Sequence, residues 1–172
     1  MTLTVPDLVI LDPSINGMTG GSASQNALVH VLTNNPHGYT LMIRASTSPA
    51  LQSSSSGAFF PNYTTAVSTT PDYDWSISLS ESAFGFTADG PDIVQLYRDN
   101  GSICNQPFDW GSPSTCWSPL ATTNANISRT DVSNETVGGA STSLEFRAES
   151  GAGNAQTSGV YQAPVIITAY MN

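Results

Sequence analysis

Short apolar segments of strand length, separated by turn-forming residues, recur along the whole chain. In residues 39–44 the side chains of Tyr39, Leu41 and Ile43 alternate with those of the residues between them. A period of two is typical of a strand with one face in a core and one face in solvent. The chain shows no heptads, no long helical period and no repeat of about 20–50 residues. These features predict an all-β single domain over residues 1–172, an immunoglobulin-like or jelly-roll-like antiparallel β-sandwich of about seven to nine strands.

The strands expected from this pattern lie at residues 2–11, 27–32, 39–44, 63–68, 74–80, 83–88, 144–148 and 160–170, with a strand or one helical turn at 93–98. The turn at 34–38 is expected to join the second and third strands as a hairpin. Within 74–80 we expect Trp75, Ile77 and Leu79 to point inward. Pro164 cannot donate a ladder hydrogen bond, so it indicates a sheet edge or the start of the last strand.

The balance of charges excludes several functions. The chain has no lysine, and its four arginines face thirteen acidic residues, for a net charge of −9. Lysine Schiff-base chemistry, a phosphate-loop lysine and lysine isopeptide bonds are therefore excluded. Nucleic-acid binding and docking on an anionic membrane both need clustered cations, which are absent. Membrane insertion is not expected either, because no segment reaches the ~18–20 apolar residues that span a bilayer.

Composition and cysteine usage indicate an exported protein. Only 10% of the residues are charged, whereas Ser, Thr and Asn together make up 55 of the 172. Cys104 and Cys116 flank a loop rich in Pro and Trp, and their spacing differs from the C-x-x-C pattern of redox and zinc sites. We expect a disulfide and hence an oxidising, extracellular or cell-surface compartment. No cationic, apolar signal peptide opens the chain, so the sequence is expected to be a mature form.

Catalysis is not expected. His30 shares a strand face with Leu28 and Leu32, which favours a structural histidine, and His37 lies in a turn. The serines lack a nucleophile-elbow motif. No cofactor is implied apart from calcium. Loops containing Asp89, Asp92 and Asp99 offer the hard oxygen ligands that calcium prefers. The alternative is that these residues serve only as turn formers.

Two binding hypotheses concern the aromatic and apolar residues. Trp110 and Trp117, with Asp109, form a candidate carbohydrate platform, unless these tryptophans pack as a small satellite core. Residues 2–11 form a candidate assembly strand that adds to the sheet edge of a neighbouring subunit, unless they pair within their own sandwich. The apolar side chains of that strand are Leu3, Val5, Leu8, Val9, Ile10 and Leu11.

Two segments carry a resemblance to known proteins. The stretch from Asn34 to Ile43 (NNPHGYTLMI) and the closing stretch from Ser158 to Ala169 (SGVYQAPVIITA) resemble bacterial cell-surface β-sandwich proteins. In this the chain is similar to WxL-type surface domains and to pilus-like surface subunits, although Tyr39 stands where that family has its tryptophan. The resemblance implies an extracellular, non-catalytic structural or adhesive role.

The sequence thus predicts a non-catalytic extracellular structural protein, a subunit or domain of a surface appendage or cell-envelope layer. Its expected partners are further copies of itself or neighbouring surface proteins. The alternative is a carbohydrate-binding or adhesive module that uses the aromatic disulfide loop, with a glycan as its partner.

Overall fold

The computed structural model describes residues 1–135 and 138–172, and it confirms the all-β prediction. The described residues form eleven strands and one short 3₁₀ helix. In chain order the elements are β1 (Thr2–Thr4), β2 (Gly21–Leu32), β3 (Tyr39–Ala45), β4 (Leu51–Ser53), β5 (Phe59–Phe60), β6 (Ser82–Asp89), η1 (Gln95–Tyr97), β7 (Ser118–Pro119), β8 (Ala125–Thr130), β9 (Ala140–Ser150), β10 (Tyr161–Gln162) and β11 (Val165–Met171). No helix of the described residues is long and apolar enough to cross a membrane.

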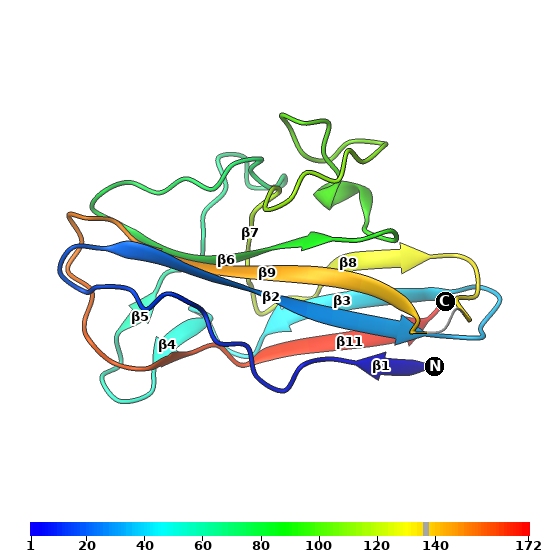
Figure 1. Ribbon diagram of the computed structural model, residues 1–172, viewed down its shortest axis with the longest axis horizontal. Helices are drawn as coiled ribbons and strands as arrows, with labels where there is room; N and C mark the ends of the chain where they lie inside the picture. The colour runs from blue at the N-terminus through cyan, green and yellow to red at the C-terminus, as the bar shows by residue number, and fades with distance from the viewer. Residues whose placement is uncertain (136–137) are drawn as a thin grey trace.

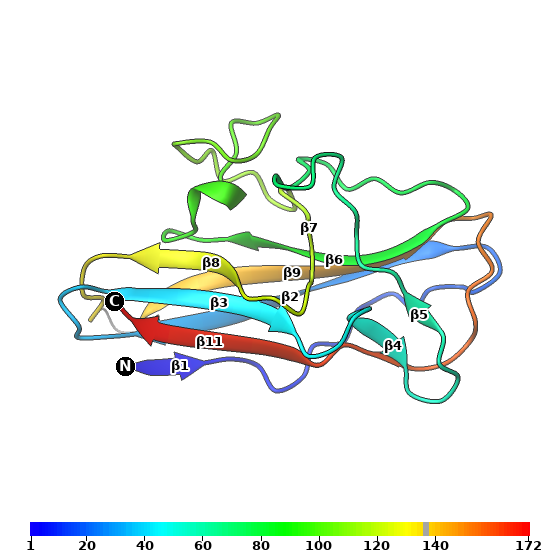
Figure 2. The ribbon, with the colours of Figure 1, turned by 180° about the vertical axis from the view of Figure 1, so that it is seen from behind.

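Two antiparallel sheets form the body of the sandwich (Figure 1). One sheet has five strands in the order β1-β2-β9-β6-β7, and the other has three in the order β11-β3-β8. A small third sheet, β10-β4-β5, lies at one end of the molecule, away from the two chain termini (Figure 2). All strand pairs within the sheets are antiparallel. The structure therefore confirms a single antiparallel β-sandwich.

The main core fills the space between the two large sheets. In β9 buried and partly buried residues alternate along all eleven positions, as a strand with one core-facing side requires. Leu144 of β9 and Phe86 of β6 face Leu41 and Ile43 of β3 in one apolar cluster. The alternation expected for residues 39–44 is confirmed, since Tyr39, Leu41 and Ile43 are almost completely buried.

A second, smaller apolar cluster covers the outer face of the five-stranded sheet. It consists of Tyr63, Ala83 and Trp117, with Trp75 and Ile77 packed against them. The cluster fastens the loops before β6 and before β7 to the outside of the sheet.

The expected hairpin between residues 27–32 and 39–44 is wrong. β2 pairs with β1 and β9, whereas β3 pairs with β11 and β8 in the other sheet. The turn itself exists, with the Gly38 amide donating to the Asn35 carbonyl over 3.0 Å, but it carries the chain from one sheet to the other. Both strands bury one apolar face, and turn residues do not determine whether the chain stays in one sheet.

Other strand predictions succeed in part. The strands at 83–88 and 144–148 are confirmed, and 93–98 contains a helical turn, η1. Residues 74–80 and 63–68 form no named strand, and Leu79 is 75% exposed instead of inward-facing. β8 lies in the Ser/Thr/Asn-rich stretch where no strand was expected. Pro164 directly precedes β11, an edge strand, as its missing donor indicated.

Candidate functional site

An apolar cleft with a volume of about 910 Å³ opens on the surface of the molecule. Residues 5–11, which we call the arm, line it together with residues 156–165. Deeper in the cleft lie the side chains of Phe60, Phe84 and Phe146, which belong to the main core. A cleft of this size and apolar character is large enough for a ligand or an added chain segment.

The backbone of the arm forms no strand, and it bends at Asp7. Only Thr2–Thr4 of the expected strand 2–11 form β1, which pairs with β2 of the same molecule. Pro6 lacks an amide hydrogen, which disfavours continuation of this ladder. Among the described residues, no backbone hydrogen bond involves residues 5–11, and pairing resumes where Asp12 and Ser24 exchange two bonds of 3.4 and 3.1 Å.

The apolar side chains of the arm divide into two groups. Val9 and Leu11 are partly buried against the main core, as is Leu3 of β1. Leu8 and Ile10 are instead 75% and 69% exposed. One side of the arm therefore contacts its own core while the other presents large apolar side chains to solvent.

The cleft also borders an open sheet edge. β11 pairs on one side with β3 and ends the three-stranded sheet on its other side. Val165 and Ile167 of β11 line the cleft. An edge strand of this kind offers unpaired N–H and C=O groups to an added strand.

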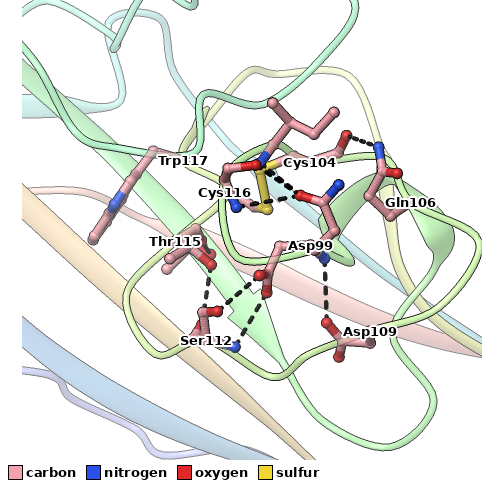
Figure 3. The surroundings of a disulfide bond; sticks show 12 residues. Asp99, Cys104, Gln106, Asp109, Ser112, Thr115, Cys116 and Trp117 are labelled. Atoms are coloured by element: carbon pink, nitrogen blue, oxygen red, sulfur yellow. Dashed lines mark hydrogen bonds between the residues drawn. A yellow bond between two sulfur atoms is a disulfide. The ribbon is translucent and has the colours of Figure 1, made fainter.

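The predicted disulfide is confirmed and closes a compact loop (Figure 3). Cys104 and Cys116 are bonded, and both are buried. The Asp99 side chain beneath the loop is 1% exposed and accepts hydrogen bonds from the Gly101 amide (2.6 Å), the Ser112 hydroxyl (2.7 Å) and the Ser112 amide (3.1 Å). These bonds satisfy a buried carboxylate that forms no ion pair within the part of the chain that the structure describes.

The predicted two-tryptophan platform is wrong, because the two rings have opposite environments. Trp117 is 1% exposed and its indole N–H donates to the Ser114 carbonyl over 2.9 Å, so it cannot stack on a ligand. Trp110 is 68% exposed. The Asp109 side chain is committed in part to the loop, since its Oδ1 accepts from the Asp99 and Gly111 amides.

The three acids of the calcium hypothesis are not brought together. Asp89 and Asp99 line a small polar hollow of about 120 Å³ with Asp109 and Glu145. Asp92 instead accepts a 3.0 Å hydrogen bond from the Tyr39 hydroxyl. Burial of Tyr39, together with the Asp92 charge, raises the pKa of this phenol. The described residues contain no group of three or more His, Cys, Asp or Glu side chains arranged to hold a metal ion.

The cleft walls are the part of the site that sequence reasoning missed. Residues 156–163 line the cleft together with the arm, whereas their sequence predicts only the start of the last strand, at residue 160, and contributes to the resemblance over 158–169. The only local signal was Pro164, which marked an edge. No known protein family matches the sequence, and no characterised protein is detectably similar to it.

Proposed function

We propose that this protein is a non-catalytic, extracellular structural subunit that assembles by strand addition between copies. The arm of one copy occupies the cleft of the next, and its backbone pairs with the free edge of β11. The observation that carries this proposal is the coexistence of an unpaired apolar arm and an open apolar cleft in one molecule. One chain thus carries both the arm that is donated and the cleft that accepts an arm, as repeated assembly requires.

The exposed side of the arm supports this proposal energetically. Removing a Leu or Ile side chain from water contributes roughly 1.5–3 kcal/mol when burial is complete. Leu8 and Ile10 leave most of this contribution unused in the single molecule. Pairing with an edge strand would also give the backbone of residues 5–11 the hydrogen bonds that it lacks.

Few contacts hold the arm to its own molecule. β1 pairs with β2 over the three residues Thr2–Thr4, and Val9 and Leu11 are only partly buried. Release of the arm from its own molecule would break only these few contacts, so the cost of passing it to a neighbouring copy is small. The extracellular setting is supported by the disulfide and by the low content of charged residues.

A matched pair of variants tests the assembly. Leu8→Asp places a charge on the arm, and Leu79→Asp places the same charge on a side chain that is equally exposed, at 75%, but does not line the cleft. We expect the native chain and Leu79→Asp to form oligomers or filaments by light scattering and electron microscopy, and Leu8→Asp to stay monomeric. A native chain that is monomeric at all concentrations, or a Leu8→Asp chain that assembles normally, would overturn the proposal.

A further inference from the structure

The ring of Trp110, on the protein surface, packs against the backbone at Gly101. At Gly101, where φ is +85°, an added Cβ would lie 2.9 Å from Cε3 and 3.1 Å from Cζ3 of Trp110. The six-membered ring of the indole therefore lies directly against the glycine. Any side chain at position 101 would displace the ring or be strained by its own backbone conformation.

The backbone on both sides of Trp110 is fixed to the same buried anchor. The Trp110 amide donates to the Asp99 carbonyl over 3.0 Å. Oδ1 of Asp109 accepts from the Asp99 amide (3.2 Å) and from the Gly111 amide (3.1 Å). Asp99 is itself buried, and the disulfide closes the loop. The position of the Trp110 ring is therefore determined before any ligand arrives, which lowers the entropy cost of binding.

The Trp110 side chain is 68% exposed, although its ring contacts Gly101. The other two tryptophans, Trp75 and Trp117, make stacked or edge contacts in the second cluster, whereas no aromatic contact among the described residues involves Trp110. Phe108 and Ile103 nearby in the chain are also more than half exposed. The loop thus exposes three large apolar side chains.

The polar surroundings of the ring favour a sugar. Asp109 precedes Trp110 in the chain, and Asn100 precedes Gly101, which the ring contacts. Asp109 Oδ2 and the Asn100 side-chain amide nitrogen have no hydrogen-bond partner among the described residues, so one free acceptor and one free donor belong to these residues. An exposed aromatic face, together with a free acceptor and a free donor on residues of the same loop, suits the C–H faces and hydroxyls of a pyranose. Anionic polysaccharides and anionic lipids are disfavoured by the net charge of −9 and by the acids of the adjoining hollow.

We propose that the surface of the disulfide loop is a binding site for a neutral polysaccharide, centred on the outer face of Trp110. The site is separate from the cleft, because Trp110 is not among the residues that line the cleft. The loop between η1 and β7, to which Trp110 belongs, rises from the five-stranded sheet on the side away from β11 (Figure 1). Structural assembly and glycan binding thus use different surfaces of one subunit.

The test is affinity electrophoresis in gels containing a soluble neutral glucan or mannan, with alginate as the anionic comparison. The monomeric Leu8→Asp background removes avidity, so a failure of assembly and a failure of glycan binding are distinguished. We expect a neutral polysaccharide to retard this chain, and Trp110→Ala to lose at least tenfold in affinity. Trp110→Tyr should retain part of the binding, and Leu79→Ala, which alters an exposed side chain elsewhere, should retain all of it.

Thermal unfolding of each variant checks that the fold is intact. The proposal is overturned if neither the glucan nor the mannan retards the chain, if alginate is preferred, or if a folded Trp110→Ala chain binds as the parent does.

Discussion

Tyr63 and Trp75 stack face to face, with ring centroids 4.4 Å apart and ring planes 20° from parallel. Trp117 meets Trp75 edge-on at 5.0 Å, and the Arg147 guanidinium lies 5.2 Å from the Trp75 centroid. The cluster rests on Gly85 of β6, where an added Cβ would lie 2.9 Å from Cβ of Tyr63 and 3.1 Å from Cζ3 of Trp75. The absence of a side chain at this position allows the loops to pack tightly on the sheet.

Gly85→Ala should therefore weaken the fold by about 1–3 kcal/mol, the usual cost of overpacking a well-filled site. Chemical denaturation of the purified chain measures this difference. Gly153→Ala is the control, because its added Cβ would lie 3.1 Å from the Leu79 carbonyl oxygen and at least 3.6 Å from every other neighbouring atom, and its φ lies outside the left-handed region. Equal stability of Gly85→Ala and the native chain would show that the cluster is not closely packed on the sheet.

Loss of the disulfide should destabilise the protein by about 3 kcal/mol, since the bond closes a short loop in the unfolded chain. The double variant Cys104→Ser, Cys116→Ser tests this by chemical denaturation, with the native chain under oxidising and reducing conditions for comparison. We also expect the intrinsic fluorescence to shift, because Trp117 follows Cys116 and pairs through its backbone with Asp72. An unchanged unfolding midpoint would contradict this account of the loop.

Alkaline pH should destabilise the fold through buried phenols. Burial raises the pKa of Tyr97 from 10.0 to about 12. The folded state thus holds the phenol proton more tightly than the unfolded state, and this stabilisation is complete below pH 10 and lost as the pH rises through 12. Tyr97→Phe should show a smaller fall in melting temperature between pH 10 and 12 than the native chain. Identical pH profiles for the two chains would contradict this role for Tyr97.

Part of the alkaline destabilisation should persist in Tyr97→Phe. Burial, helped by a hydrogen bond to Asp72, raises the pKa of Tyr63 to about 12 as well. Tyr63→Phe in the Tyr97→Phe background should therefore reduce the fall further. Absorbance at 295 nm during the titration reports phenol ionisation directly.

The sequence predicts local features well and pairing partners poorly. The alternation of Tyr39, Leu41 and Ile43 follows from burial of one face, and the structure confirms it. The same alternation at 74–80 arises from packing of Trp75 and Ile77 on the second cluster, without a sheet partner. A period of two reports an extended chain with one covered side, and it does not identify what covers that side.

For the candidate sites too, the sequence predicts local features better than contacts between residues far apart in the chain. Trp110 and Trp117 lie seven positions apart in similar surroundings of Ser and Pro, yet one is exposed and the other buried. The disulfide followed from cysteine spacing, which is local. The cleft did not, because residues that line it lie about 150 positions apart in the chain and meet only in the folded sandwich.

Cross-linking between copies tests strand addition most directly. The two native cysteines are bonded to each other, so one copy carrying Leu8→Cys and a differently tagged copy carrying Val160→Cys each present a single free thiol. Both positions line the cleft. The account predicts a disulfide-linked heterodimer of the two tagged copies under mild oxidation. It predicts no heterodimer when Val160→Cys is replaced by Val132→Cys, since Val132 is as exposed as Val160 but does not line the cleft. A bond that forms only within one chain carrying both Leu8→Cys and Val160→Cys would contradict exchange of the arm between subunits.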